Sequence, residues 1–71
     1  MTTYRRACSG LYYSTNGNFK IERRTGLTLV RRWYVFVIDS HGYWNVLDHA
    51  PSLRAARNMV ETFLKLRAWF E

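Results

Sequence analysis

The chain has 71 residues, with 11 Lys and Arg against 5 Asp and Glu, and a net charge of +6. This length fits one small domain, and a hydrophobic fraction of 48% excludes a disordered tail. The longest apolar run, Trp33–Ile38, is far shorter than the roughly 20 residues of a membrane helix. We therefore expect a single domain over residues 1–71 that does not enter a membrane.

The start of the chain and its one cysteine indicate the compartment. Residues 1–6 lack the apolar core of a secretory signal. Cys8 has no second cysteine to pair with, so an internal disulfide is excluded and a reducing cytoplasm is favoured. No evident base accompanies Cys8, and we expect it to pack as a small, partly buried residue.

The excess positive charge lies entirely in the first half of the chain. Residues 1–38 contain seven Lys and Arg and one acid, whereas residues 39–71 contain four of each sign. Such a surface can simply keep a small protein soluble, or it can bind a polyanion, most often nucleic acid. An acidic protein or a membrane surface is a further alternative.

Asn16–Gly17 predicts a first hairpin, with a two-residue type I′ turn between strands at residues 10–14 and 19–23. In this register Tyr12 lies opposite Ile21, and directly opposed residues share a face. One face then carries Tyr12, Phe19 and Ile21. The other carries Tyr13, Lys20, Glu22 and Arg24.

A second hairpin is predicted from strands at residues 30–39 and 43–47, joined by a three-residue loop with Gly42 in the left-handed conformation. One of its faces holds Tyr34, Phe36, Ile38, Trp44 and Val46. The other holds Arg31, Trp33, Val35, Val37, Tyr43 and Asn45. A two-residue loop would group the faces differently, and a one-residue slip would invert them, so both assignments stay open.

Ser52 predicts the N-cap of a helix that runs from Leu53 to about Phe70, since apolar residues recur there at helical spacing. The predicted fold is α+β: an antiparallel sheet of three to four strands, formed by two hairpins, with the helix packed on one face. We expect one contiguous core of Phe19, Ile21, Phe36, Trp44, Ala56, Val60 and Phe63.

The second sheet face has no helix to cover it and must meet water or a partner. Its predicted members are Arg24, Arg31, Trp33, Val35 and Val37. If Trp33 instead lies under the helix, the exposed strip consists of Arg32, Tyr34, Phe36 and Ile38. An apolar strip with a basic rim is typical of an interface, with nucleic acid or with a second copy of the chain.

Acids and histidines gather around the second hairpin, at Asp39, His41, Asp48 and His49. They do not predict a metal site, because His41 and His49 would lie about 26 Å apart at opposite ends of a strand. Turn and cap roles suit them better. The sequence contains no Gly-rich phosphate loop, Ser-His-Asp arrangement or paired carboxylates, so we expect no enzyme, metal or cofactor.

The strands followed by a capped helix with the sequence Ser52–Arg57 resemble the three-stranded-sheet-plus-helix DNA-binding domains of plant ethylene-response factors and phage-type integrases. This resemblance implies a sheet that lies in the major groove and reads it with Arg and Trp. Arg24, Arg31 and Trp33 occupy the comparable strand positions.

Three further segments, Tyr12–Ile21, Trp33–Val35 and Pro51–Arg57, are similar to small accessory proteins of bacteriophages that infect actinobacteria. This similarity implies action in the host bacterial cytoplasm, on the host's DNA or on its proteins.

These observations together predict a small, basic, non-enzymatic DNA-binding accessory protein whose partner is double-stranded DNA. Residues 1–9 are expected to form a flexible basic arm. The predicted nucleic-acid contacts are Arg5, Arg6, Tyr13, Lys20, Arg24, Arg31 and Trp33. The alternative is a protein-interaction module that binds and inhibits a host protein through the uncovered sheet face or Trp69.

Overall fold

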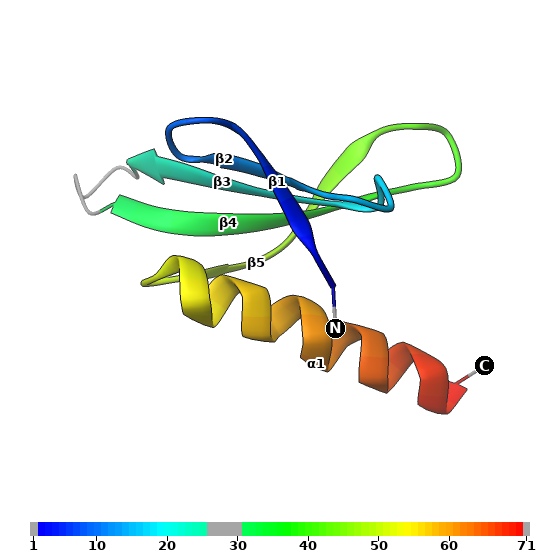
Figure 1. The fold of residues 1–71 in the computed structure, drawn as a ribbon. Coiled ribbons are helices and arrows are strands. Elements are labelled where there is room, and N and C mark those ends of the chain that lie inside the picture. Colours follow the sequence, from blue (N-terminus) through cyan, green and yellow to red (C-terminus); the bar gives the residue numbers. More distant parts are fainter. Residues whose placement is uncertain (1, 26–30, 71) are drawn as a thin grey trace.

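The computed structural model describes residues 2–25 and 31–70 and shows a five-stranded sheet with one helix on one face (Figure 1). The elements are β1 (Tyr4–Cys8), β2 (Leu11–Ser14), β3 (Phe19–Thr25), β4 (Arg31–Ile38), β5 (Trp44–Ala50) and α1 (Leu53–Phe70). The strands follow one another in the order β1-β2-β3-β4-β5, and each pairs antiparallel with its neighbour. The predicted α+β class is confirmed, whereas the predicted count of three to four strands is wrong.

The additional strand is β1, in the segment expected to be a flexible arm. Tyr4 lies opposite Ser14 and Arg6 opposite Tyr12, so this part of the arm is an edge strand of the sheet. The doublet Arg5–Arg6 places one charge on each face and hides the alternation that would have indicated a strand. Cys8, at the end of β1, is exposed rather than partly buried.

The β2–β3 hairpin has the predicted register but a different turn. The amide of Gly17 donates to the carbonyl of Ser14 at 3.0 Å, which centres the turn on Thr15 and Asn16. The buried Ser14 hydroxyl donates to Asn16 Oδ1 at 2.7 Å and accepts from the Phe19 amide at 2.9 Å. These hydrogen bonds stabilise a loop that has more residues than the predicted two-residue type I′ turn.

The Asp39 amide donates to the Tyr43 carbonyl at 2.9 Å beyond the ends of β4 and β5, which leaves a loop of the predicted three residues with Gly42 at a φ of 85°. Asp39 closes it: its carboxylate accepts from the amides of His41 and Tyr43, each at 2.9 Å, and from the Asn45 side chain at 3.1 Å. These hydrogen bonds, the one from Tyr43 foremost, lower the pKa of the Asp39 carboxyl. Asp39 is thus a turn residue, as expected.

The pairing of β3 with β4 decides which sheet face the helix covers. Ile21 lies opposite Val35 and Phe19 opposite Val37, so the helix side of β4 is Trp33, Val35 and Val37. The predicted uncovered face is therefore wrong, and the alternative with Trp33 under the helix is right. The buried core consists of Phe19, Ile21, Val35, Ala50, Ala56 and Val60. The predicted core members Phe36 and Trp44 lie on the opposite face, where Phe36 is buried and Trp44 is half-buried.

Helix α1 begins at the predicted cap. Ser52 accepts from the Ala55 amide through its hydroxyl at 3.1 Å and from the Ala56 amide through its carbonyl at 3.0 Å. The helix packs against β3, β4 and β5, and the start of β1 comes down beside the middle of α1 (Figure 1). Within the described ranges, no helix combines the length and the apolar character needed to cross a membrane.

Phe63→Ala tests this packing, because the Phe63 ring meets Phe19 edge-on at a centroid distance of 5.9 Å. We expect the variant to lose about 3 kcal/mol of unfolding free energy in urea titrations followed by circular dichroism. The control is Leu66→Ala, one turn further along, where the side chain is 56% exposed and the loss should stay below about 1 kcal/mol. Equal losses would show that the helix face is wrongly assigned.

Candidate nucleic-acid interface

The sheet face turned away from α1, here called the open face, gathers aromatic and basic side chains from all five strands. Strand register places on it Arg5, Leu11, Tyr13, Lys20, Glu22, Arg24, Arg32, Tyr34, Phe36, Ile38, Trp44, Val46 and His49. Four of these side chains are cationic, and Glu22 is the single carboxylate. The open face is therefore positive over the part of the chain that the structure describes.

A covered aromatic ring lies at the centre of the open face. Phe36 is only 5% exposed although α1 packs on the other face of the sheet. Lys20 lies above the ring, with Nζ 4.5 Å from its centroid, and the Arg24 guanidinium carbon lies 5.1 Å away. The aliphatic stems of these two side chains exclude water from Phe36 while their charged ends stay at the surface.

Beside Phe36, two further rings reach the surface. Tyr13 and Trp44 meet at a centroid distance of 6.0 Å and an interplanar angle of 58°. Lys20 Nζ also lies 5.1 Å from the Trp44 ring. Tyr13 is 36% exposed and Trp44 is half-buried, so both rings can be reached from solvent. Rings in this setting can stack on bases.

The basic side chains differ in how far their charge is neutralised. Arg24 forms an ion pair with Glu22, whereas Arg32 donates from Nε to His49 Nδ1 at 2.9 Å. Among the described residues, Arg5, Lys20 and Arg32 have no carboxylate within ion-pair distance. Arg24 and Arg32 also lie directly opposite each other on β3 and β4. Opposed like charges disfavour the fold, and an anion bound between them would offset the repulsion.

Four of the predicted contact residues come together on the open face: Arg5, Tyr13, Lys20 and Arg24. Arg6 does not, because it lies opposite Tyr12 on the helix side of the sheet. Arg31 is the first residue of β4, and its side chain lies outside the described residues. The side chain of Trp69, considered for a protein interface, also lies outside them.

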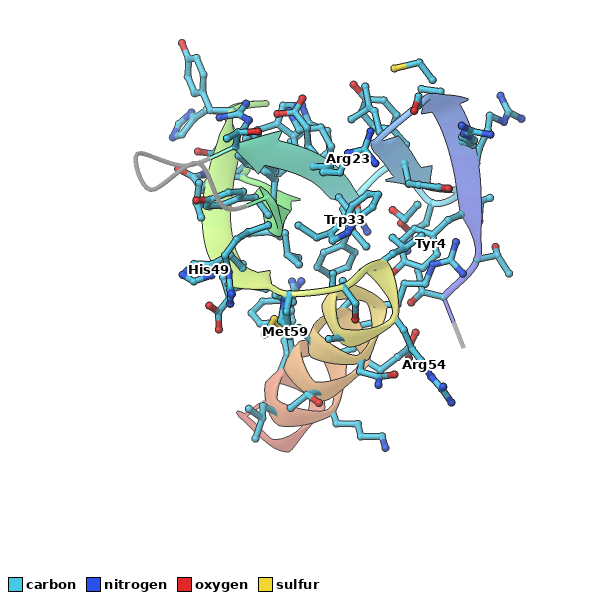
Figure 2. All side chains as sticks on the ribbon, turned by 90° about the vertical axis from the view of Figure 1, so that its left-hand side faces the viewer. Tyr4, Arg23, Trp33, His49, Arg54 and Met59 are labelled. Atoms are coloured by element: carbon cyan, nitrogen blue, oxygen red, sulfur yellow. The ribbon has the colours of Figure 1, made fainter. Side chains whose placement is uncertain are left out.

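Trp33 is the main correction to the predicted site. It is half-buried between the sheet and α1 (Figure 2) and packs against the core. The centroids of the Trp33 and Tyr12 rings are 6.0 Å apart. The Arg23 guanidinium lies 5.7 Å from its centroid. Strand alternation puts Arg32, Trp44 and His49 on the open face instead. The sequence contains this alternation but does not show which side of β4 faces the helix.

A second basic and aromatic cluster lies where β1 passes α1. The Arg57 guanidinium lies 5.0 Å from the Tyr4 ring and 5.5 Å from the Tyr12 ring. The hollow beside them has a volume of about 720 Å³ and is lined by Thr2, Thr3, Tyr4, Leu53, Arg54, Arg57, Asn58 and Glu61. Figure 2 shows two of these residues, Tyr4 from β1 and Arg54 from α1. Glu61 accepts from the Thr2 amide at 2.7 Å, which lowers the pKa of its carboxyl. This bond connects the segment just before β1 to the helix.

No protein family, curated protein or solved structure matches the chain. Within the described residues, no three His, Cys, Asp or Glu side chains are grouped so as to hold a metal ion. The geometry of the open face is thus the main basis for a functional assignment.

The variant Tyr4→Phe tests the packing of β1 against α1, because it removes only the Tyr4 hydroxyl. This hydroxyl is buried without a hydrogen-bond partner among the described residues, and this burial, aided by Glu61 and opposed by Arg57, raises the pKa of Tyr4 to about 12. Tyr4→Phe removes the unsatisfied hydroxyl and keeps the ring under Arg57, so its stability at neutral pH should equal or exceed that of the wild type.

The same variant has a distinct pH dependence. The folded state holds the Tyr4 proton more tightly than the unfolded chain, so the wild type should lose stability relative to Tyr4→Phe between pH 10.0 and about 12. Urea titrations of both proteins at a series of pH values measure the difference. Parallel pH profiles would contradict the burial of this hydroxyl.

Proposed function

We propose that the protein is a small, non-enzymatic accessory protein that binds nucleic acid through its open face. One observation carries the proposal: rings that solvent can reach, Tyr13 and Trp44, and interleaved cations share the sheet face that α1 leaves uncovered. Aromatic rings stack on bases irrespective of sequence, and Lys and Arg bind the phosphate backbone. DNA is the expected polyanion.

The roles of the individual side chains follow from their contacts. Lys20, Arg32 and Arg5 contact phosphates, because their charges have no carboxylate partner among the described residues. Arg24 contributes less charge, since Glu22 already pairs with it. Tyr13 contacts bases or sugars together with a residue that the sequence did not indicate, Trp44.

We further propose that the protein acts in the bacterial cytoplasm, as its resemblance to phage accessory proteins implies. The free, exposed thiol of Cys8 supports this location. A reducing compartment keeps such a thiol from forming intermolecular disulfides.

A second candidate function, binding of a host protein, is favoured by a separate apolar feature. A hollow of about 390 Å³ lies between β5 and α1, lined by Leu47, Asp48, Ala55, Asn58, Met59, Thr62, Phe63 and Leu66. Exposed apolar side chains beside a hollow are typical of protein-binding surfaces. The two functions separate experimentally, because only nucleic-acid binding requires the cations of the open face.

The salt dependence of DNA binding tests the first function. Fluorescence anisotropy of a labelled oligonucleotide should give a log–log slope of about −3 to −4 between roughly 50 and 200 mM salt, because three or four phosphates are neutralised. Arg32→Ala should reduce the magnitude of this slope by about 1. The control is Arg54→Ala. Arg54 is an exposed residue of α1 on the other side of the sheet, so its removal takes away the same charge and should leave the slope unchanged.

Two results would contradict this proposal. If the wild type does not bind DNA at low salt, nucleic-acid binding is rejected and the protein-binding function remains. If Arg32→Ala and Arg54→Ala reduce the slope equally, binding is not confined to the open face.

A further inference from the structure

We infer that the open face binds single-stranded rather than double-stranded nucleic acid; this inference rests on the proposed function. It departs from the duplex DNA expected from the sequence, and it depends on where the central side chains of the open face lie.

A sheet that reads a duplex needs long polar side chains that project into the groove and reach the base edges. The long side chains at the centre of the open face are Lys20 and Arg24, and both lie down on the ring of Phe36, at 4.5 and 5.1 Å from its centroid. Arg24 is also held by Glu22. These contacts keep both side chains against the sheet, and Arg32 is held by its bond to His49, so the centre of the open face lacks the projecting donors that reading a groove requires.

The rings favour a single strand for a separate reason. In a duplex each base is stacked between its neighbours, and aromatic side chains have no base face to meet. Bases of a single strand can splay apart and stack on aromatic side chains one at a time. Tyr13 and Trp44 are partly exposed, and their planes are tilted by 58°. Two tilted rings suit two splayed bases better than a continuous stack.

The positions of the basic side chains fit an extended nucleic-acid backbone that runs beside these rings. Lys20 lies directly opposite Tyr13, and the opposed pair of Arg24 and Arg32 lies four residues further along β3. That separation corresponds to about 13 Å along an extended strand. A short stretch of single-stranded nucleic acid can therefore place bases on the rings and a phosphate beside Arg32, whose charge has no carboxylate partner among the described residues.

The test compares one labelled DNA sequence of about a dozen nucleotides as a single strand and as a duplex, by anisotropy at low salt. We expect the single strand to bind at least about ten-fold more tightly, the contribution of one or two stacked bases. Equal or tighter binding of the duplex would overturn this inference while leaving the proposed function intact. Failure of both forms to bind would overturn the proposed function itself.

Variants of Tyr13 test whether base stacking causes the preference for single-stranded DNA. Tyr13→Ala should weaken single-strand binding about ten-fold and duplex binding much less. Tyr13→Phe keeps the ring and should bind like the wild type, so its failure to bind would overturn the stacking role even if Tyr13→Ala proves unstable. Tyr43→Ala is the matched control: Tyr43 is 71% exposed, lies outside the Tyr13–Trp44 pair and should not affect binding.

Discussion

The antiparallel pairing of β3 with β4 is the constraint on which the rest of the molecule depends. With Ile21 opposite Val35, the side chains of Trp33, Val35 and Val37 on β4 meet α1, and those of Tyr34 and Phe36 turn to the other face. A shift of one residue would exchange the two sets. The same pairing therefore determines the hydrophobic core and, through the other side of the same strands, the composition of the open face.

A sheet with one helix must keep large rings on its second face without a second covering layer. On the open face the cover is supplied by long basic side chains, because Lys20 and Arg24 shield Phe36. On the helix side, Arg57 covers Tyr4 in the same way. These contacts bury apolar surface and at the same time hold positive charge at the molecular boundary. Structural cover and the proposed binding chemistry thus come from the same side chains.

Local patterns predicted most elements, because glycine positions, alternation and the Ser52 cap act within a few residues. They did not predict β1, where consecutive arginines obscure the period of two. They also did not decide which face α1 covers: every residue of Trp33–Ile38 is apolar, so neither side of this strand is marked as the inner one. The pairing of β4 with β3, which residues 26–30 separate in the sequence, decides which side of β4 faces α1. As a result, the candidate site contains Trp44 and not the expected Trp33.

The directly opposed arginines of β3 and β4 give ionic strength two contrary effects on this protein. Added salt screens the repulsion between Arg24 and Arg32 and between the other cations of a chain of net charge +6, which favours the folded state. The same screening weakens the attraction of those cations for a polyanion. High salt, which stabilises the free protein most, is therefore the condition in which the proposed complex is weakest. In that complex, the phosphate backbone would screen the same repulsion in place of the salt.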